Sequence, residues 1–375
     1  MGVVIDSPGH VVFRDLPAPP AQLEKGYYLV EMAAAPINPS DLMYIEGRYP
    51  ASAPTAPGKL RVGGFEGTGI VRAAGGGDAK HSMVNHPVAL WIPEGGTWAH
   101  QVVVPAHLVM ELPKGVSLGL GSPWVNPLTA LALVQKAQNH HDPMTGKSLK
   151  PVAVALTAAA SSLGRMIIRL AAEKKSNLVV LGIVRKAEQC DQLRSLGCEH
   201  CFTTTDPAFD DQFREAAAHL NCTLCYDCVG GSLPGRILRL MPPGSTVVVY
   251  GSLDPQPTLD GLSPMDLLIH GKRIEGFHLH MFLEAIGKKD TAKLMTTARD
   301  KWAGPLATSI NKRLPMDQVS NALEEYRRNM SAGKVLLTGP AMPPEELRQP
   351  PSAEAPAAQS TAPTQAHTSQ PGSSS

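Results

Sequence analysis

The stretch that decides the fold is Pro151-Val-Ala-Val-Ala-Leu-Thr-Ala-Ala-Ala-Ser-Ser-Leu-Gly164. Its apolar run from Val152 to Leu156 is typical of a fully buried strand. Small residues follow, and Arg165-Met-Ile-Ile-Arg-Leu-Ala-Ala-Glu173 then has the periodicity of a helix. The stretch therefore predicts a strand that turns directly into a helix.

The turn has the spacing of a dinucleotide fingerprint, in which a phosphate lies against small residues at the N-terminus of the helix. Ala159 and Ser161 stand where the first two glycines of that fingerprint are usual, and only Gly164 is kept. Taken alone, the turn is equally consistent with a phosphate-binding turn and with a structural connection that binds no ligand. The rest of the chain has to decide between these two interpretations.

Length and charge narrow the class of protein. The chain has 375 residues, of which 43% are hydrophobic, and a formal net charge of +1. This length allows two packed domains. The near-neutral charge argues against a nucleic acid partner, and no apolar run approaches the length of a membrane span. The N-terminal segment resembles neither a signal peptide nor an organellar leader, and we expect a cytoplasmic protein.

The cysteines include two groups with spacings that occur in metal sites, Cys198 with Cys201, and Cys222 with Cys225 and Cys228. However, Cys225 and Cys228 lie in a strand-like run, where residues three apart point to opposite faces and cannot share a metal. We therefore expect reduced, packed cysteines, because a cytosolic compartment also disfavours disulfides.

The chain divides into segments of different pattern. Residues 1–123 contain short β-like runs separated by Gly and Pro, which predicts a small, partly open β-barrel. A short helix over 40–46, with Ser40 as its N-cap, interrupts these runs. From 124 to 279 strands and helices alternate, which predicts a doubly wound parallel sheet of the Rossmann type. Its expected strands are 152–157, 178–184, 200–204, 223–229, 246–251 and 273–279.

The remaining segment returns to the first domain. Residues 280–339 contain two helical runs and a final strand over 334–338, which we expect to complete the barrel. Residues 340–375 are rich in Pro, Ser, Ala, Thr and Gln and hold few large apolar side chains, so we expect a disordered tail. The predicted fold class is α/β, a barrel domain beside a Rossmann domain.

This arrangement resembles the medium-chain dehydrogenase/reductase superfamily, whose barrel is GroES-like. The resemblance covers about residues 1–339 and is closest to the zinc-free enoyl-thioester reductases and the quinone oxidoreductases. The segments that carry it are Ala35-Pro-Ile-Asn-Pro-Ser-Asp41 with Gly47-Arg-Tyr-Pro50, Gly63-Gly-Phe-Glu-Gly-Thr-Gly69, Trp124-Val-Asn-Pro-Leu-Thr-Ala130 and Tyr250-Gly-Ser-Leu253.

The resemblance also bears on zinc. Zinc-dependent members use a cysteine in the first of these segments and a histidine in the second, where this chain has Asn38 and Phe65. No nearby set of two cysteines and a histidine, or of three histidines, replaces them, and no four-cysteine lobe lies between 90 and 115. We therefore expect no metal.

Without a Lewis acid, the negative charge that develops on a reduced substrate needs a proton donor or hydrogen bonds. The resemblance gives this role to Tyr49, which aligns with the tyrosine thought to donate the proton, or orient the substrate carbonyl, in enoyl-thioester reductases. The alternative is a turn tyrosine that only packs before Pro50, since quinone oxidoreductases often show a similar Gly-x-Tyr-Pro. Tyr44 is the lesser candidate.

Cofactor choice depends on the end of the second strand, where a fold that binds NAD usually places Asp or Glu. This sequence has Arg185 and Lys186 there, whose charges suit the 2′-phosphate of NADPH, although a solvated helix start is the alternative. Enoyl reductases of this type also carry an Ala-x-Ser-x-x-Gly fingerprint, so the resemblance favours a bound dinucleotide.

The resemblance adds residues near the nicotinamide. Asn126 aligns with a family asparagine at that end of the cofactor, although it could merely cap the following helix. His278 departs from an aromatic residue of the family. The complete set of expected cofactor-binding residues is Asn126, Thr129, Ala159, Ala160, Ser161, Ser162, Leu163, Gly164, Arg185, Lys186, Tyr250, Gly251, Ser252, Leu253, Phe277, His278, Leu279 and Lys334.

The leading hypothesis is an NADPH-dependent, zinc-independent oxidoreductase that reduces an activated C=C bond in an enoyl thioester or an enone. One alternative is an NADPH:quinone oxidoreductase, and another is a non-catalytic NADPH-binding protein, crystallin-like or a scaffold. By analogy with the family, residues 272–279 form the interface of a possible homodimer.

Overall fold

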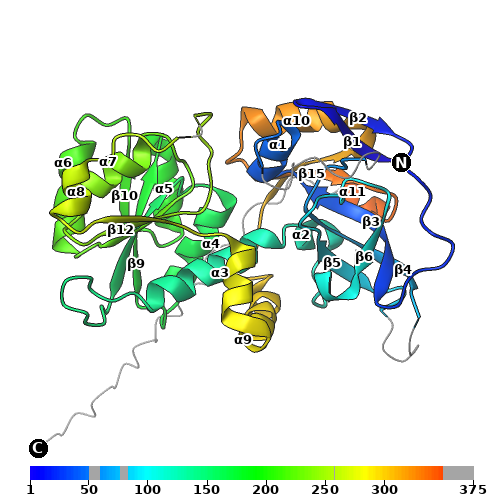
Figure 1. The fold of residues 1–375 in the computed structure, drawn as a ribbon, viewed down its shortest axis with the longest axis horizontal. Coiled ribbons are helices and arrows are strands. Elements are labelled where there is room, and N and C mark those ends of the chain that lie inside the picture. The colour runs from blue at the N-terminus through cyan, green and yellow to red at the C-terminus, as the bar shows by residue number, and fades with distance from the viewer. Residues whose placement is uncertain (50–59, 77–82, 257, 349–375) are drawn as a thin grey trace, which may run out of the picture.

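The computed structural model describes residues 1–49, 60–76, 83–256 and 258–348. Two lobes, each built on its own sheet, lie side by side, and helix α3 (Val125–Gln138) lies between them (Figure 1). One lobe holds a seven-stranded sheet and a two-stranded sheet, and the other holds a six-stranded sheet. The expected α/β fold with a barrel-like domain and a Rossmann domain is confirmed.

The six-stranded sheet has the order β10-β9-β8-β11-β12-β13, and every neighbouring pair is parallel. The order reverses between β8 and β11, which makes the carboxyl ends of those strands the expected ligand crevice of a doubly wound sheet. Its strands are β8 (Val152–Thr157), β9 (Leu178–Val184), β10 (His200–Thr203), β11 (Leu224–Asp227), β12 (Thr246–Val249) and β13 (Arg273–Gly276).

Helices cover both faces of this sheet, so the central strands are continuous apolar runs, as the sequence of β8 predicts. All six residues of β8 are buried. The connecting helices are α4 (Ser162–Ala171), α5 (Ala187–Ser195), α6 (Phe209–His219), α7 (Leu233–Leu240) and α8 (Pro264–Leu268). The last predicted strand is too long, because β13 ends at Gly276 and helix α9 (Leu279–Lys301) begins at Leu279.

The seven-stranded sheet is built from both ends of the chain. It contains β3 (Tyr27–Pro36), β4 (Glu66–Ala74), β5 (Pro87–Trp91), β6 (Gln101–Pro105) and β7 (Val109–Glu111), and it is completed by β14 (Ile310–Pro315) and β15 (Lys334–Thr338). Because β15 pairs antiparallel with β3, the chain returns to the first domain as expected. The exact domain boundaries at 123 and 279 stay a prediction.

Smaller elements complete this lobe. The two-stranded sheet pairs β1 (Gly2–Ser7) with β2 (His10–Arg14), and the short helices are α1 (Pro39–Ile45) and α2 (Leu118–Gly121). Helix α10 (Val319–Arg328) precedes β15. The N-cap of α1 is Asn38, so the expected cap at Ser40 is wrong by two residues. Pro39 suits the first helical position because its missing N–H would have no partner there.

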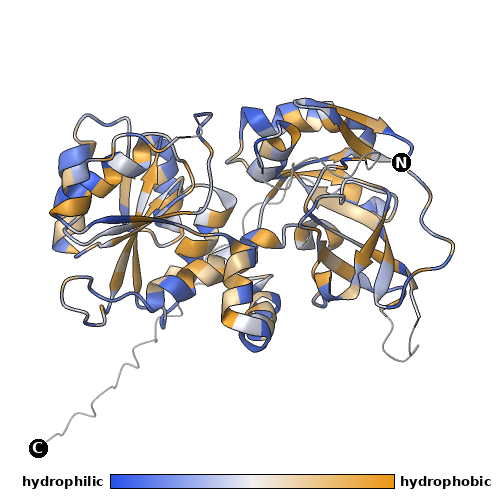
Figure 2. Ribbon diagram, in the orientation of Figure 1, coloured by the Kyte–Doolittle hydropathy of each residue, from blue (hydrophilic) through white to orange (hydrophobic). Residues whose placement is uncertain are grey.

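Apolar residues concentrate on the strands, whereas the helices carry both apolar and polar residues (Figure 2). One core cluster spans both lobes, from Ala33 and Ala89 through Trp124 to β8 and α4. No helix of the described residues has the length and apolar character needed to cross a membrane.

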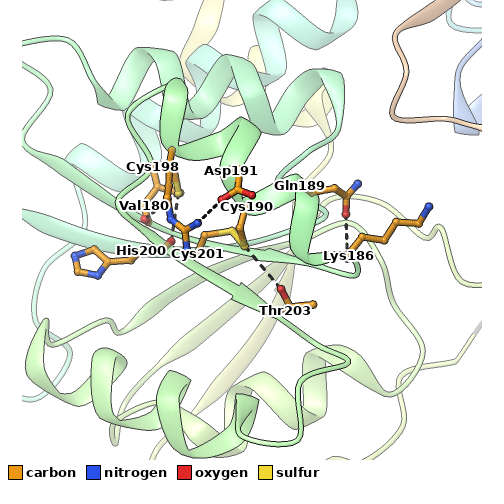
Figure 3. The surroundings of a disulfide bond; sticks show 10 residues. Val180, Lys186, Gln189, Cys190, Asp191, Cys198, His200, Cys201 and Thr203 are labelled. Atoms are coloured by element: carbon orange, nitrogen blue, oxygen red, sulfur yellow. Dashed lines mark hydrogen bonds and ion pairs between the residues drawn. A yellow bond between two sulfur atoms is a disulfide. The ribbon is translucent and has the colours of Figure 1, made fainter.

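The structure corrects the expectation of reduced cysteines at one pair. Cys190 of α5 and Cys201 of β10 form a disulfide, with their Cα atoms 5.5 Å apart (Figure 3). The helix and the strand are consecutive elements packed on each other, which brings these side chains together. The other cysteines, Cys198, Cys222, Cys225 and Cys228, are free and buried.

The expected tail also begins too early. Residues 340–348 are part of the folded lobe and include helix α11 (Pro344–Leu347). Glu346 in this helix is buried, and its carboxylate accepts hydrogen bonds from the backbone N–H groups of Leu118 (3.0 Å) and Gly119 (2.9 Å). The part of the predicted tail from 349 onward lies outside the described residues.

Candidate active site

The turn between β8 and α4 is built for close backbone packing. Ala158 has a positive φ of 46°, and the Ser161 hydroxyl oxygen caps α4 by accepting a hydrogen bond from the Gly164 N–H at 3.1 Å. A Cβ on Gly164 would lie 2.3 Å from the carbonyl oxygen of Ala159. Glycine is therefore required there for helix α4 to approach the strand, which is the role of the third fingerprint glycine.

The same turn fits a phosphate. Ser162 and Leu163 begin a ten-residue helix, so their backbone N–H groups have no partner within the helix. Such N–H groups, together with the positive end of the helix dipole, form an anion site. Ala159 and Ala160 are buried beneath the turn, whereas Ser161 and Ser162 are half-buried and reach its surface. These residues fit the pyrophosphate of a dinucleotide.

Arg185 and Lys186 follow β9 directly and are exposed. Neither side chain has an ion-pair partner among the residues that the structure places. The Thr205 hydroxyl donates to the backbone carbonyl of Arg185 at 3.2 Å, so the loop after β10 supports the end of β9. The two cations thus stand free on the rim of the crevice, on the side that would hold the adenosine of a dinucleotide.

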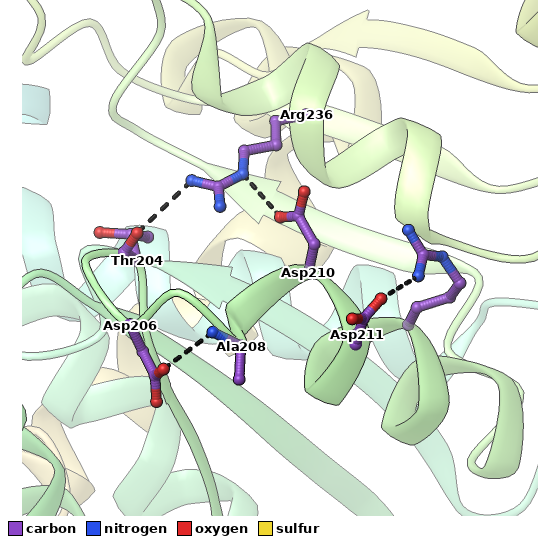
Figure 4. Close-up of polar contacts among 7 residues, drawn as sticks. Thr204, Asp206, Ala208, Asp210, Asp211 and Arg236 are labelled. Atoms are coloured by element: carbon purple, nitrogen blue, oxygen red, sulfur yellow. Dashed lines mark hydrogen bonds and ion pairs between the residues drawn. The ribbon is translucent and has the colours of Figure 1, made fainter.

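The loop after β10 is itself fixed by polar contacts (Figure 4). Arg236 of α7 donates from Nε to the Asp210 carboxylate at 2.7 Å and from Nη1 to the Thr204 carbonyl at 3.4 Å. The Asp206 carboxylate accepts from the Ala208 N–H at 2.9 Å. These hydrogen bonds fix the loop after β10, and that loop in turn contacts the backbone of Arg185 through Thr205.

Several residues expected near the nicotinamide lie at the carboxyl ends of β12 and β13. Tyr250 follows β12 and donates from its backbone N–H to the Asp227 carbonyl at 2.7 Å, and Leu253 donates in the same way to Cys228 at 3.0 Å. The Phe277 N–H donates to the Val249 carbonyl at 2.8 Å. These bonds hold both segments, 250–253 and 277–279, beside the crevice.

Tyr49 lies at the boundary between the lobes. Its ring packs on Phe65, with centroids 5.2 Å apart, and its hydroxyl lies 3.4 Å from Nε2 of His278, which caps α9 in the other half of the structure. Burial, and to a lesser degree the nearby Asp41, raise the pKa of Tyr49 above its usual value. Burial, assisted by His280, lowers the pKa of His278. Both groups are therefore neutral at neutral pH.

Tyr44, the lesser candidate, lies elsewhere. Its side chain is almost fully buried, and its hydroxyl donates to the Glu94 carbonyl at 3.2 Å. A phenol that is enclosed and already bonded to the backbone has no access to a substrate. Between the two tyrosines, the geometry favours Tyr49.

A buried polar cluster lies behind Tyr49, and sequence reasoning named only part of it. The Asn38 side-chain amide donates to the Glu66 carboxylate at 2.7 Å, and its carbonyl oxygen accepts from the Lys334 ammonium group. The Asp41 carboxylate accepts from the Asn38 backbone N–H at 2.7 Å. The signal for Asp41 and Glu66 was present in the sequence, since each is a carboxylate inside a quoted motif.

Burial dominates the ionisation of this cluster. It raises the pKa of Asp41 to about 8, with the Glu66 carboxylate adding to the effect, and it raises the pKa of Glu66. It also lowers the pKa of Lys334, against the attraction of both carboxylates. At neutral pH we therefore take Asp41 as protonated, which leaves one carboxylate and one ammonium group.

Glu66 connects the cluster to α3. Its second carboxylate oxygen accepts from the Val125 backbone N–H at 2.5 Å, at the N-terminus of α3. A negative charge is favourable at this end of a helix. Asn126 and Thr129, the expected nicotinamide neighbours, lie on the first turns of the same helix.

Lys334 was expected to reach the cofactor, but in the structure its side chain is 4% exposed and points to Asn38. The structure therefore brings Lys334 together with the residues behind Tyr49 rather than with the fingerprint turn. Among the described ranges, no group of three or more His, Cys, Asp or Glu side chains is arranged to hold a metal ion.

Comparisons with known proteins agree with this architecture. The family model of the alcohol dehydrogenase GroES-like domain matches residues 24–114, and that of the zinc-binding dehydrogenase matches residues 162–297. Mitochondrial enoyl-[acyl-carrier-protein] reductase of Xenopus tropicalis is 27% identical over 327 residues, which cover 82% of this chain and 86% of the relative. Prostaglandin reductase-3 of Bos taurus is 29% identical over 278 residues, which cover 72% of this chain and 68% of the relative.

A solved structure is similar over the same range. A protein from Mesorhizobium loti, described as an NADPH:quinone reductase, is 28% identical with a TM-score of 0.71, covering 85% of this chain and 88% of the other. Both lobes and their connection thus have counterparts in one solved chain. The chain therefore belongs to the medium-chain dehydrogenase/reductase superfamily, as a nicotinamide-dependent oxidoreductase of the branch that holds enoyl reductases and quinone oxidoreductases.

Proposed function

We propose that the protein reduces an activated C=C bond, in an enoyl thioester or another α,β-unsaturated carbonyl, with NADPH and without zinc. The observation that carries this proposal is the Tyr49 phenol, held on Phe65 at the boundary between the lobes. The relatives named enoyl reductase and prostaglandin reductase support the same type of reaction.

When bound, the cofactor would supply a hydride, and the residues of the fingerprint turn would hold its pyrophosphate. Arg185 and Lys186 support NADPH over NADH, because a 2′-phosphate would meet two exposed cations there. Segment 250–253, with Phe277 and Leu279, would line the nicotinamide end. The proposed role of the protein at the substrate is to bind the carbonyl and to deliver a proton.

Tyr49 is the proposed proton donor. Addition of hydride to Cβ leaves negative charge on the carbonyl oxygen and on Cα, and a neutral phenol can stabilise that charge and then give up its proton. The raised pKa of Tyr49 keeps the phenol protonated at neutral pH. General acid catalysis of this kind contributes about 10²- to 10⁴-fold to a rate.

The absence of zinc is proposed on the chemistry of the residues at the corresponding position. Asn38 and Phe65 offer an amide oxygen and a hydrocarbon ring where zinc needs a thiolate and an imidazole. The Asn38 amide oxygen already accepts from Lys334, so a cation placed there would face an ammonium group. Both facts disfavour a divalent metal.

The experiment is a substrate panel read out by NADPH consumption, with and without a chelator. We expect turnover of crotonyl and longer enoyl thioesters that the chelator leaves unchanged, and a fall in kcat of about 10²-fold or more in Tyr49→Phe. Tyr27→Phe, a half-buried tyrosine on β3 with no role at the boundary, is the matched control. Full activity in Tyr49→Phe would contradict the proposed donor.

Quinone reduction is the second candidate, favoured by the similarity to the Mesorhizobium loti protein. A quinone can take its protons from water, so this activity would survive Tyr49→Phe. Tight NADPH binding without turnover of enoyl thioesters, enones or quinones would instead support a non-catalytic NADPH-binding protein.

We also propose a homodimer through β13. This strand is the edge of the six-stranded sheet, and exposed apolar side chains lie at the end of α8, a few residues before it in the chain, with Leu268 73% and Ile269 72% exposed. An edge strand and an apolar surface of this kind favour association. Analytical ultracentrifugation of the wild type and of Ile269→Asp tests it, and a wild-type monomer would contradict it.

A cytoplasmic location stays a prediction, to be tested by cell fractionation.

A further inference from the structure

We propose that His278 is a positioning residue for Tyr49, which orients the phenol O–H toward the substrate and returns a proton to it after each turnover. This inference rests on the proposed function of Tyr49. It gives His278 a role different from the cofactor contact expected from the sequence.

The geometry places these two side chains together from distant parts of the fold. Tyr49 follows α1, and His278 lies between β13 and α9, yet the hydroxyl oxygen and Nε2 are 3.4 Å apart. Catalytic hydrogen bonds are often this long before a substrate is bound. The Tyr49 ring packs on Phe65, with ring centroids 5.2 Å apart, which limits the positions that its hydroxyl can take.

Orientation follows from the tautomer. An imidazole that carries its proton on Nε2 donates to the phenol oxygen, and this leaves the phenol O–H to point at a substrate. His278 is neutral at neutral pH, since burial and the neighbouring His280 lower its pKa. A neutral imidazole can hold this tautomer, and the His278 side chain is exposed, so its ring can exchange protons with water.

The other titratable groups around the pair are few in the described residues. His280 lies on the first turn of α9, where it contacts Trp91 and pairs with Glu284 at 3.2 Å. Asp41 acts on Tyr49 from the side of α1. His280 therefore opposes protonation of His278, and Asp41, where ionised, opposes formation of the phenolate.

The proton balance is complete. When Tyr49 protonates the reduced substrate, its O–H bond breaks, a C–H bond forms at Cα, and a phenolate remains. Nδ1 of His278 takes a proton from a solvent hydronium ion, and the Nε2–H bond then breaks as the phenol O–H forms again. The proton left on Nδ1 passes to water while water protonates Nε2, which restores the starting tautomer. The imidazole ends neutral, and the two electrons of the reaction come from the hydride alone.

This step matters because the environment disfavours a phenolate. Burial and Asp41 both raise the pKa of Tyr49, so a phenolate left without a proton source would be unfavourable. A neighbouring imidazole that supplies the proton removes that difficulty.

The test compares wild type, Tyr49→Phe, His278→Gln and His278→Ala, with His219→Gln as control, since His219 is an exposed histidine at the end of α6. Glutamine keeps an N–H donor but cannot relay a proton. We expect His278→Gln to lower kcat about 10- to 100-fold with NADPH affinity and KM within twofold. Added imidazole should restore part of the activity of His278→Ala.

The pH profile separates a proton relay from a structural role. The wild-type kcat should rise as the pH falls through the pKa of His278, below 6.5, because imidazolium gives up its proton more readily. This inflection should be absent in His278→Gln. A kcat within twofold of wild type at every pH, or a loss of NADPH affinity that accounts for the whole effect, would overturn the proposal.

A second measurement needs no substrate. In NMR spectra of protein labelled at tyrosine Cζ, the Tyr49 signal, identified by its loss in Tyr49→Phe, should shift as His278 titrates and should stop doing so in His278→Gln. Absence of that shift overturns the pairing itself. An intact shift in a protein that reduces no enoyl thioester or enone supports the pairing and contradicts the proposed function instead.

Discussion

The Lys334 ammonium group donates a hydrogen bond to the side-chain carbonyl of Asn38, which lies 296 residues earlier in the chain. This contact ties the last strand of the seven-stranded sheet to the N-cap of α1, directly behind the candidate proton donor. It also brings an ammonium group into a buried cluster with Glu66 and Asp41. The ionisation of that cluster has a measurable consequence.

Asp41→Asn should flatten the pH dependence of stability. Burial raises the pKa of Asp41 to about 8 in the folded protein, against about 4 in an unfolded chain. Below pH 4 the group binds its proton in both states, and its stabilising contribution is then lost as the pH rises from about 4 to about 8. The loss is at most about 1.4 kcal/mol per pH unit.

Thermal unfolding midpoints of the wild type and of Asp41→Asn between pH 5 and pH 8 test this prediction. The wild-type midpoint should fall more steeply with rising pH. Asp300→Asn, at an exposed carboxylate on α9, is the control and should run parallel to the wild type. Parallel curves for Asp41→Asn as well would mean that Asp41 is ionised in the folded protein.

Arg185→Glu should weaken NADPH binding and leave NADH binding almost unchanged. Loss of a charge-assisted bond costs about 1.5–3 kcal/mol, or roughly 10- to 100-fold in Kd, and the new carboxylate would also repel the 2′-phosphate. Fluorescence titration with both nucleotides measures the effect. Arg214→Glu, at an exposed arginine on α6 that pairs with Asp211, is the matched control. Equal affinity for the two nucleotides in the wild type would remove the basis for NADPH.

A reducing agent should destabilise the wild type but not a Cys190→Ser/Cys201→Ser double variant. The bridge joins residues 11 apart, and closing so short a loop stabilises a protein by about 2–3 kcal/mol through the unfolded chain. Unfolding midpoints with and without dithiothreitol measure the difference. The buried free cysteines are common to both proteins and serve as the internal control. An equal response of both proteins would show that the bridge is not formed in solution.

The sequence predicted best what depends on local pattern. Strands β8 and β9 were placed with their correct bounds because both are continuous apolar runs that helices cover on both faces. The fingerprint turn could also be found from local pattern, because its small residues are adjacent in the chain. Gly164 could be singled out because one close approach of backbone to backbone excludes every side chain there.

Contacts between distant segments could not be predicted in this way. The Tyr49–His278 contact depends on how the two lobes meet, which no spacing in the sequence encodes. The Cys190–Cys201 bridge was missed because the strand argument considered only cysteines three residues apart, and this pair joins a helix to a strand. Glu346 was missed because a four-residue helix has too few turns for periodicity to reveal it.

Truncation should locate the real end of the folded chain. Removal of everything after Gly339 deletes Glu346, which leaves the N–H groups of Leu118 and Gly119 without their acceptor inside the protein. Hydrogen bonds to a charged group contribute about 1.5–3 kcal/mol, so the unfolding midpoint should fall clearly. A chain that ends at Arg348 keeps α11 and should unfold like the full-length protein. Glu346→Gln, which retains one acceptor oxygen, should lie between the two. If the chain ending at Gly339 were as stable as the chain ending at Arg348, the hydrogen bonds from Leu118 and Gly119 to Glu346 would not stabilise the fold. The boundary at Gly339 predicted from the sequence would then be correct.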